Sequence, residues 1–533
     1  MTHRCRATIQ ILSLIALLLG RYQVLAADAV FNIRDYGAKG DGAALDTAAI
    51  NQAIEACAKS AGGQVLFPLG RYLSGTVRLK SHITLRFDVG AALVGTTNLD
   101  QYQQPAVPSF MTEAKWGKWH RGLVVGENIE DVTIAGPGVI DGNKVFDPTG
   151  EEQMRGPHTI AFVNCRRLTI RDVNIVDSAN YAVFFQVSDD VDIRNVKITG
   201  GWDGVHWRGA PDRWCKNVNI IGCQFYTGDD SIAGRYWDNT VIADCIINSS
   251  CNGIRVIGPA TRLIVNRCLF YGPGLQPHRT SGEKRRTNML SGIILQPGAW
   301  DRTRGLLDDV LLANNSMHNV ASPVTIWTKP DNPVGRVTVS GLDAMGVYRS
   351  ALSVESWADA PITNVVVRNA HIEFTGGGTA EQASQLVKGP GVDARPLPAW
   401  GVFARNVEQL TFEDVRLSLA QEDLRPVVLA DRVQRLSLDN FKFTRVPGVT
   451  EPLVTTNVGK VTVRDSELGS ALTRPIPRHG LKPTPSSAES AAACGLSSRA
   501  RRRARYQLIS PRSTRVRKRK SPLAARGRRR TAP

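Results

Sequence analysis

The middle of the chain repeats a short pattern, seen in Val191-Asp-Ile-Arg-Asn-Val196-Lys-Ile198 and again in Val218-Asn-Ile-Ile-Gly-Cys223-Gln-Phe225. Steps between equivalent positions are 23, 27, 22 and 23 residues. Fixed periods of this size are typical of a solenoid, and alternating apolar and polar residues within each run predict strands. We therefore expect an all-β fold, a parallel β-helix with coils of about 22–28 residues. The positions counted are Val173, Val196, Cys223, Cys245 and Cys268, and similar runs return at Val310, Val337, Val365, Leu410, Leu436 and Val461.

The period also predicts which polar residues stack. Neighbouring coils of a β-helix lie ~4.8 Å apart, so residues one step apart form a column. Applying the steps of 27 and 22 to Asp203 leads to Asp230 and then Asn252, and stepping back by 23 leads to Asn180. Asp229 lies beside this column, one residue out of register.

Three carboxylates in one place suit acid–base chemistry. Like charges held close together raise the pKa of at least one group, so one aspartate can act as an acid while another acts as a base. Asp229 and Asp230 can share a cleft only if the strand bends, and Gly228 supplies a permissive backbone. The competing interpretation is that such residues are ordinary corners of β-helix turns. We expect that role for Asp172, Asn195 and Asp244, which occupy one turn column.

Several motifs occur in order along the chain: Phe31-Asn-Ile-Arg-Asp-Tyr-Gly-Ala-Lys-Gly-Asp-Gly42, Gly63-Gln-Val-Leu-Phe-Pro-Leu-Gly-Arg-Tyr72, Gly136-Pro-Gly-Val-Ile-Asp-Gly-Asn143 and Thr227-Gly-Asp-Asp230. Over residues 30 to 470 the chain resembles glycoside hydrolase family 28, the polygalacturonase-like enzymes of the pectate-lyase-like β-helix superfamily. The resemblance implies a right-handed parallel β-helix with a short N-terminal helical cap, and hydrolysis of glycosidic bonds with inversion.

The same resemblance implies a role for each aspartate. Asp229 is the general acid that protonates the leaving oxygen, and Asp203 with Asp230 holds and deprotonates the attacking water. Asp203 matches the Asp of the family's Asn-Thr-Asp motif, although Gly201 and Trp202 precede it here. Acid and base carboxylates of an inverting enzyme stand roughly 6.5–9.5 Å apart, which we expect side chains one residue and one coil apart to span.

Two departures from the family's pattern bear on the substrate. Asn252 stands where the family's Gly-His-Gly motif has its His, and Ile294 and Gln296 stand where its Arg-Ile-Lys motif has two cations. Uncharged side chains make no charge-assisted contact with a galacturonate carboxylate. We therefore expect a neutral or substituted sugar, or a linkage outside plain polygalacturonan. Arg255 could restore one cation, but alternation places it on the face of Gly253, so Arg235 is the better placed candidate.

Further substrate contacts are expected around the aspartates. His206 could donate a hydrogen bond to a sugar hydroxyl, and aromatic rings could stack on sugar faces. Each has the alternative of a place in the core or on the surface. The candidates for substrate binding are Asn252, Arg235, His206, Trp207, Arg255 and Gln296, with Trp237, Trp300 and Trp327 as further aromatic candidates.

The two ends of the chain differ from its middle. Residues 1–26, with Arg4 and Arg6 before a short apolar run, predict a secretory signal peptide. That run is too short to span a bilayer, so no transmembrane segment is expected in the mature protein. Residues 28–472 are the expected catalytic β-helix domain. Residues 475–533 hold 17 Lys plus Arg and one acidic residue, so this tail carries +16 of the net charge of +18.

The basic tail is expected to be disordered. It either binds acidic polysaccharide or an anionic cell surface, or has no function. No nucleic-acid partner is expected, because the charge outside the tail is nearly balanced.

The nine cysteines matter if the chain is exported. Cys223, Cys245 and Cys268 share one column and are expected to form a buried stack. Cys215 and Cys251 are the better candidates for a disulfide bond. The sequence has no spacing typical of metal ligands, so we expect no metal and no cofactor.

The sequence thus predicts a secreted (extracellular or periplasmic), monomeric glycosidase that acts on pectin or another plant or microbial polysaccharide. The alternative is a non-catalytic carbohydrate-binding β-helix protein, which the missing His, Arg and Lys of the family motifs support. The complete set of carboxylates favours the enzyme. A lyase is a third possibility, but it would need a base beside a uronate and usually a bound cation.

Overall fold

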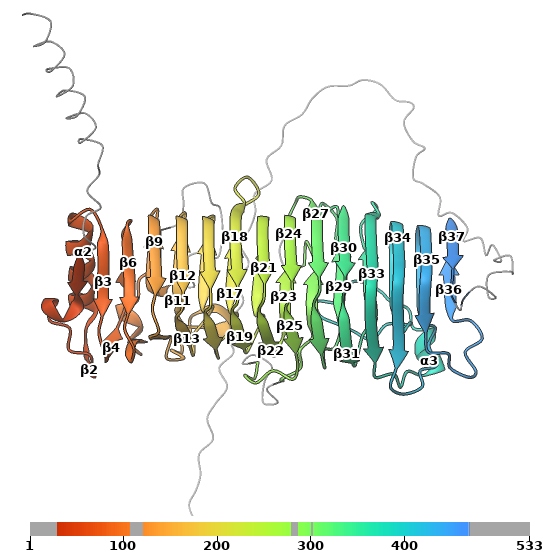
Figure 1. The fold of residues 1–533 in the computed structure, drawn as a ribbon, viewed down its shortest axis with the longest axis horizontal. Coiled ribbons are helices and arrows are strands. Elements are labelled where there is room, and N and C mark those ends of the chain that lie inside the picture. The colour runs from red at the N-terminus through yellow and green to blue at the C-terminus, as the bar shows by residue number, and fades with distance from the viewer. Residues whose placement is uncertain (1–28, 107–120, 279–285, 300–301, 467, 469–533) are drawn as a thin grey trace, which may run out of the picture. The chain divides into compact units, whose positions relative to one another are not determined.

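The computed structural model describes residues 29–106, 121–278, 286–299, 302–466 and 468. These residues form 37 strands, and each coil contributes one strand to each of three parallel ladders (Figure 1). The predicted all-β, right-handed parallel β-helix is therefore confirmed. The predicted signal segment (1–26) and basic tail (475–533) lie outside the described residues.

The first ladder carries the candidate site. Its members are β5 (Val77–Arg78), β8 (Gly122–Glu127), β11 (His158–Val163), β14 (Val183–Gln186), β17 (Val205–Arg208), β20 (Ile232–Arg235), β23 (Asn252–Val256), β26 (Ser291–Leu295), β29 (Val324–Thr328), β32 (Leu352–Ser356) and β36 (Leu453–Thr456).

The second ladder contains the repeat that reveals the period. Its members are β1 (Val30–Asn32), β3 (Gly63–Phe67), β6 (Ile83–Phe87), β9 (Glu130–Ala135), β12 (Arg166–Arg171), β15 (Asp189–Arg194), β18 (Cys215–Ile221), β21 (Trp237–Ala243), β24 (Ala260–Asn266), β27 (Leu307–Ala313), β30 (Arg336–Ser340) and β37 (Lys460–Arg464).

The third ladder completes each coil. Its members are β2 (Asp41–Leu45), β4 (Gly70–Ser74), β7 (Ala91–Gly95), β10 (Val139–Asp141), β13 (Asn174–Val176), β16 (Lys197–Thr199), β19 (Gln224–Thr227), β22 (Ile246–Ser249), β25 (Leu269–Tyr271), β28 (Ser316–His318) and β31 (Asp343–Val347). Three long strands pass through more than one ladder: β33 (Ile362–Phe374), β34 (Val402–Leu419) and β35 (Val428–Phe443).

The observed register reproduces the period. Leu168 pairs with Val191, which pairs with Val218, then Thr240 and then Leu263, in steps of 23, 27, 22 and 23 residues. The later repeats continue this ladder from Val310 to Val461 through all six predicted positions. Because apolar side chains at these positions alternate into the interior, they form one continuous core.

The turn residues Asp172, Asn195 and Asp244, which we call the corner column, adopt the conformation that turns require. Asp172, Asn195 and Asp244 have φ of 60°, 52° and 57°, the left-handed region that Asn and Asp tolerate better than most residues. The Asn195 side-chain amide donates to the Asp172 carboxylate over 2.9 Å. The corner interpretation is therefore confirmed for these three residues.

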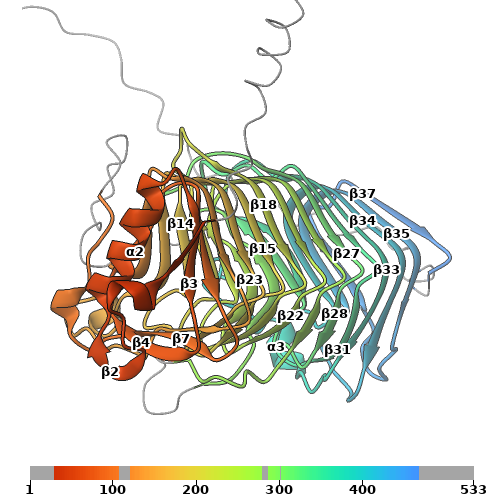
Figure 2. The same cartoon turned by 60° about the vertical axis from the view of Figure 1, so that its left-hand side comes forward.

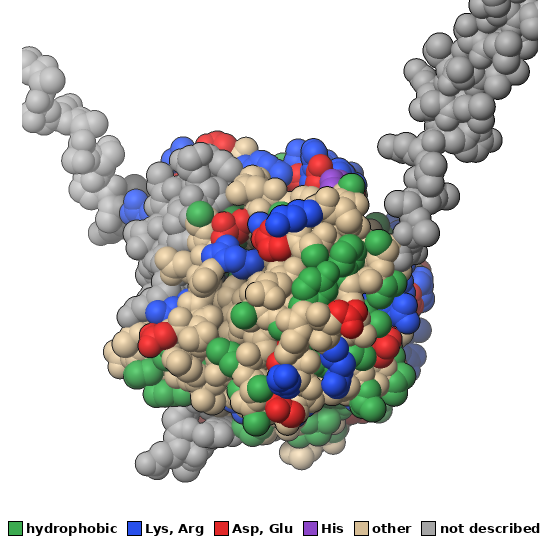
Figure 3. Space-filling model, turned by 90° about the vertical axis from the view of Figure 1, so that its left-hand side faces the viewer, with side chains coloured by type: hydrophobic (Ala, Val, Ile, Leu, Met, Phe, Trp, Pro, Cys, Tyr) green, Lys and Arg blue, Asp and Glu red, His purple; other side chains and the backbone are tan. Residues whose placement is uncertain are grey.

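A short helix covers the N-terminal end of the coils, as predicted (Figure 2). In α2 (Thr47–Lys59) the apolar residues Ile50, Ala53, Ile54 and Cys57 recur on one face and are buried against the first strands. Acidic and basic side chains are interspersed on this end of the molecule (Figure 3). The other helices described are α3 (Ala380–Ala383) and the 3-10 turns η1 (Ile33–Tyr36), η2 (Leu99–Gln101) and η4 (Glu151–Gln153).

The described cysteines are all free and buried. Cys223, Cys245 and Cys268 form the predicted interior stack. The expectation of a bridge between Cys215 and Cys251 is wrong, because Cys215 packs in the core while Cys251 lies beside the aspartates. In the described ranges, no helix combines the length and apolar character needed to cross a membrane.

Candidate active site

The register of the first ladder brings Asp203, Asp230 and Asn252 into line. Val205 pairs with Ile232 and Ile232 with Ile254, which are steps of 27 and 22 residues. The column is therefore confirmed for these three residues. The prediction for Asn180 is wrong: Val183 pairs with Val205, a step of 22, so that coil is one residue shorter and Tyr181 stands opposite Asp203.

The three aspartates converge as predicted. Asp203, Asp229 and Asp230 are 4%, 8% and 5% exposed, and one carboxylate oxygen of each lies within 4.8 Å of the others. This spacing is shorter than the separation of acid and base expected for an inverting enzyme. Asp203 and Asp230 stack on adjacent coils, and Asp229 directly precedes Asp230 in the chain. Gly228 is needed for a close approach, since a Cβ there would lie 2.5 Å from the carbonyl oxygen of Gly201.

Asp229 is held by two cationic or polar side chains from irregular loops. Arg155, between β10 and β11, donates from Nη2 to Oδ2 over 3.0 Å, and Nε2 of His278, between β25 and β26, lies 3.5 Å from Oδ1. Burial alone would raise the pKa of Asp229, but His278 and Arg155 together hold it well below its ordinary value. The Asp229 carboxylate is therefore ionised in the ligand-free site.

Trp202 supports both of these partners. Its ring lies 4.0 Å below the Arg155 guanidinium and meets the His278 ring edge-on at 6.3 Å. The Trp that departs from the family's Asn-Thr-Asp motif thus organises the surroundings of Asp229. Arg155 and His278 were missed from the sequence because their loops carry no repeat.

Asp203 is bound to a neutral histidine. His206 Nδ1 lies 2.6 Å from Asp203 Oδ2, and Arg208 donates from Nε to His206 Nε2 over 3.0 Å. Because an arginine only donates, Nε2 carries no proton, and Nδ1–H donates to Asp203. Burial, together with the charges of Arg208 and Arg235, lowers the pKa of His206 well below its ordinary value. The expectation that His206 donates to a sugar hydroxyl is wrong, because both ring nitrogens are engaged within the protein.

The pKa values of the other two aspartates are shifted in the opposite direction from that of Asp229. Burial and the charges of Asp229 and Asp230 raise the pKa of Asp203 well above its ordinary value. Burial also raises the pKa of Asp230, although Arg255 opposes this. The raised pKa of Asp203 favours its protonated form, whereas the resemblance assigns the acid role to Asp229.

Asn252 and Arg255 both hold Asp230. Asn252 donates to Oδ1 from its backbone N (3.1 Å) and from Nδ2 (2.8 Å), and Arg255 Nη1 donates to Oδ2 over 3.4 Å. The alternation argument against Arg255 was wrong, because Asn252 is the first residue of β23, where the chain leaves a turn. Gln296 is buried and accepts from Arg255 Nε over 2.7 Å.

The sequence model of the family described as Glycosyl hydrolases family 28 matches residues 57–256, the region that contains all three aspartates. Over these residues the chain is similar to this family. A probable polygalacturonase of Vitis vinifera is 28% identical over 222 residues, covering 39% of this chain and 45% of the relative. An exopolygalacturonase of Platanus acerifolia is 24% identical over 413 residues, covering 70% of this chain and 98% of the relative. The chain thus spans less than half of the Vitis relative's length.

A solved structure supports the fold. The hyperthermoactive exopolygalacturonase from Thermotoga maritima is similar with a TM-score of 0.54 at 20% identity, covering 73% of this chain and 92% of that one.

Three of the four aromatic candidates are buried and do not line the site. Trp207 and Trp237 are fully buried in the core, with ring centroids 3.9 Å apart, because the alternation that turns His206 outward turns Trp207 inward. Trp327 is also buried. Trp300 lies outside the described residues. Arg235 pairs in register with Arg208 on the neighbouring coil, on the side of His206.

Of the three donor sets in the described part of the chain that approach metal-ligand geometry, two contain Asp229. One is the aspartate trio, and the other joins Asp229 with Cys251 and His278, again within 4.8 Å. Guanidinium groups already occupy them: Arg155 donates to Asp229, and Arg286 Nη2 donates to Cys251 Sγ over 3.2 Å. A cation would meet these positive charges, so the donors suit proton transfer better than metal binding.

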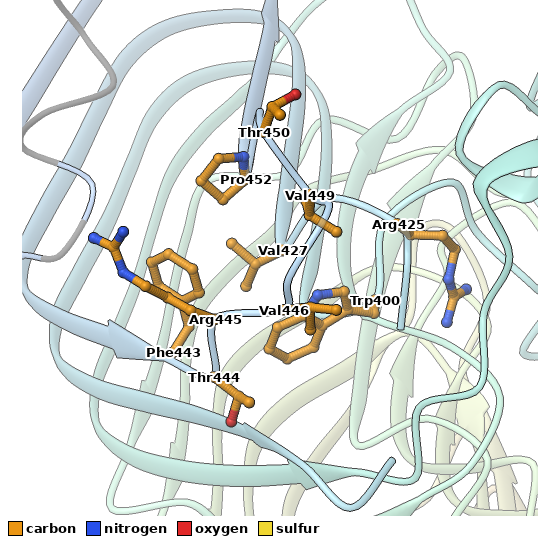
Figure 4. A pocket seen from close by; sticks show the side chains of 10 residues that line it. All are labelled: Trp400, Arg425, Val427, Phe443, Thr444, Arg445, Val446, Val449, Thr450 and Pro452. Carbon is orange, nitrogen blue, oxygen red and sulfur yellow. The ribbon is translucent and has the colours of Figure 1, made fainter. Parts of the chain in front are cut away.

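A separate cavity of ≈ 290 Å³ lies towards the C-terminal coils and contains none of the aspartates (Figure 4). Trp400 and Phe443 contribute aromatic walls, and Arg425 closes one side. Arg425 is paired with the buried carboxylate of Asp423, so its charge is already neutralised.

Proposed function

We propose that this protein hydrolyses glycosidic bonds of pectin or a related plant or microbial polysaccharide by acid–base catalysis with inversion. The observation that carries the proposal is the convergence of three buried aspartates from two adjacent coils. The match to the family model supports the reaction class, and relatives named polygalacturonase or exopolygalacturonase support a pectin-type substrate. Secretion, a monomeric state and a polysaccharide partner are part of this proposal.

Asp229 is assigned as the acid and Asp203 with Asp230 as the groups that hold and activate water. The proton that rests on Asp203 must reach Asp229 when a glycosidic oxygen approaches. Their oxygens are close enough for a transfer through one intervening group or water. The two hydrogen bonds that connect Arg208 to His206 and His206 to Asp203 then stabilise Asp203 as an ionised base, because His206 Nδ1–H already donates to the Asp203 carboxylate.

A neutral or substituted sugar, or a linkage outside plain polygalacturonan, remains the proposed substrate. Ile294 and Gln296 occupy the family's cation positions and both are fully buried. Arg255 is turned towards Asp230 and Gln296 rather than towards open solvent. A non-catalytic binding protein is not favoured, because buried like charges destabilise a fold and have no use in a module that only binds.

The test is release of reducing ends from galacturonan, rhamnogalacturonan, xylogalacturonan and neutral polysaccharides. Activity is expected on at least one pectin-derived polymer, and the product anomer, followed by proton NMR, is expected to be inverted. Retention would indicate that the closely spaced carboxylates work through a covalent intermediate. No turnover of any of these polymers would overturn the proposal.

A substrate with an activated leaving group separates the roles of the aspartates. Such a bond needs no protonation, so Asp229→Asn is expected to keep most of its activity on it while Asp203→Asn does not. The opposite result would assign the acid to Asp203, in line with its raised pKa.

A further inference from the structure

A long connection returns from the C-terminal coils to the active site. Residues 375–401 link β33 to β34, and we call them the strap. In the middle of the strap, Val392 and Asp393 meet Arg255, which is 138 residues away from Asp393 in the chain. The strap therefore forms part of the site wall next to Asp230.

The strap binds Nη2 of the Arg255 guanidinium. Nη2 donates to the carbonyl oxygen of Val392 over 2.9 Å and to Oδ1 of Asp393 over 3.1 Å. Nε donates to Gln296, whose own Nε2 donates to the same Val392 carbonyl over 3.0 Å. Arg255 is consequently buried, with Asp230 on one side and Asp393 on the other.

Three further contacts fix the strap in this position. Arg395 Nη2 donates to the buried Glu355 carboxylate over 2.6 Å. Gly378 N donates to Asp423 over 2.9 Å, and Arg425 Nη1 donates to the carbonyl oxygen of Leu397 over 2.9 Å. Trp400, at the end of the strap, packs edge-on against Phe374 and lines the cavity of Figure 4. The contact with Arg255 is thus part of a packed connection, anchored at both ends.

The Asp393 carboxylate accepts from Arg255 Nη2, the kind of contact that the carboxylate of an anionic sugar would make with an arginine. We propose that Asp393 is a specificity-determining residue, which withholds Arg255 from a substrate carboxylate and so selects a sugar without a carboxylate beside Asp230. This inference rests on the proposed function. The Asp393 side chain is 28% exposed, so its charge also faces an approaching substrate and repels a uronate.

The experiment compares kcat/KM for oligogalacturonides and for their fully methyl-esterified forms of equal length. Asp393→Asn is expected to raise the ratio of galacturonide to ester by about tenfold, because one charge-assisted hydrogen bond becomes available and one repulsion disappears. Asp393→Glu keeps the charge and is expected to keep the wild-type ratio. An unchanged ratio in Asp393→Asn overturns the inference.

Asp431→Asn is the matched control. Asp431 lies on β35, is 24% exposed and pairs with Arg405 over 3.0 Å. Its replacement therefore removes a similar ion pair from the first ladder, the ladder that also contains Arg255. The ratio should not change in this variant. An equal increase in both variants would show a general charge effect and overturn the role of Asp393.

A binding measurement distinguishes failure of this inference from failure of the proposed function. If the wild type cleaves neither substrate, the proposed activity on pectin fragments fails, but calorimetric titration with the galacturonate trimer still reports on Arg255. Tighter binding by Asp393→Asn than by the wild type and Asp431→Asn supports the inference, and equal binding overturns it. Circular dichroism of each variant confirms that it is folded.

Discussion

Two groups of buried carboxylates in this β-helix differ in their cationic partners and in the direction of their pKa shifts. Asp423, beside the strap, is fully buried and accepts hydrogen bonds from Nε and Nη2 of Arg425 and from two backbone N–H groups. Burial favours its neutral form, but the contacts with Arg425 outweigh this and lower its pKa. At the active site, by contrast, three carboxylates share Arg155 and Arg255, and their pKa values move apart.

The difference separates a structural carboxylate from those to which we assign catalysis. A buried acid with its own arginine has one stable ionisation state and holds two segments together. Acids that outnumber their cations retain a proton that can be passed between them. Substitutions in the two groups should therefore affect different properties.

The largest effect is expected for Asp229→Asn. Asparagine has the same shape but cannot supply the proton, so kcat should fall roughly 10²–10⁴-fold. Reducing-end release on the best substrate measures this, and thermal unfolding checks that the fold persists. Wild-type activity in this variant would exclude Asp229 as the acid and remove the contrast with Asp423.

Asp423→Asn should instead reduce stability. It leaves the Arg425 guanidinium without its charged partner in a nearly buried position, which lowers the free energy of unfolding by about 3 kcal/mol. Urea unfolding followed by tryptophan fluorescence measures the change. The activity per folded molecule at low temperature should stay close to that of the wild type, and a loss comparable to that of Asp229→Asn would contradict a purely structural role.

The repeat period explains which of these residues were predictable. A parallel ladder keeps one hydrogen-bond register from coil to coil, so steps of 27 and 22 placed Asp230 and Asn252 correctly beneath Asp203. The same rule failed at Asn180, because the turn before β17 is one residue shorter than the turn before β14. Alternation along a strand would also have assigned Trp207 to the core, since Val205 and Trp207 point the same way.

The loops supply what the period cannot predict. Arg155, His278 and Asp393 come from connections of irregular length, where no spacing relates one coil to the next. Their positions depend on how each loop packs against the sheet. Sequence alone therefore identified the carboxylates and Arg255, but it missed Arg155 and His278, which hold Asp229, the proposed acid.

His278→Gln should change the pH dependence of catalysis. His278 helps to hold the pKa of Asp229 down, so its removal raises that pKa and lets the acid keep its proton to a higher pH. The alkaline limb of the pH profile of kcat, which reports the enzyme–substrate complex, should move upward, with kcat reduced by about tenfold because Asp229 is less well oriented. A pH–rate profile of both proteins measures this. A limb that stays in place, or moves to lower pH, would show that His278 does not control the acid.

Asp203→Asn should lose activity and gain stability, the opposite sign from Asp423→Asn. The pKa of Asp203 is higher in the folded than in the unfolded protein, so its stabilising contribution is complete below the unfolded pKa and is lost as pH rises through the folded pKa. Asparagine does not ionise and avoids this loss. The variant should be about 1 kcal/mol more stable than the wild type at neutral pH. The gain should vanish in acid, which urea unfolding at several pH values tests, and a gain that is the same at every pH would contradict the linkage.

The smallest effect is expected in the corner column, which has the same residue types without the crowding. Asn195→Gly relieves a left-handed backbone (φ 52°) but loses the hydrogen bond to Asp172, so the two changes should cancel to within about 0.5 kcal/mol. Asn195→Val is the matched control: a β-branched side chain at positive φ should destabilise the fold by about 1–2 kcal/mol. Urea unfolding measures both, and kcat should be unchanged in each. A loss of activity in Asn195→Gly would mean that the corner and catalytic columns are coupled, because a corner that serves only the turn has no route by which to alter the charges around Asp203.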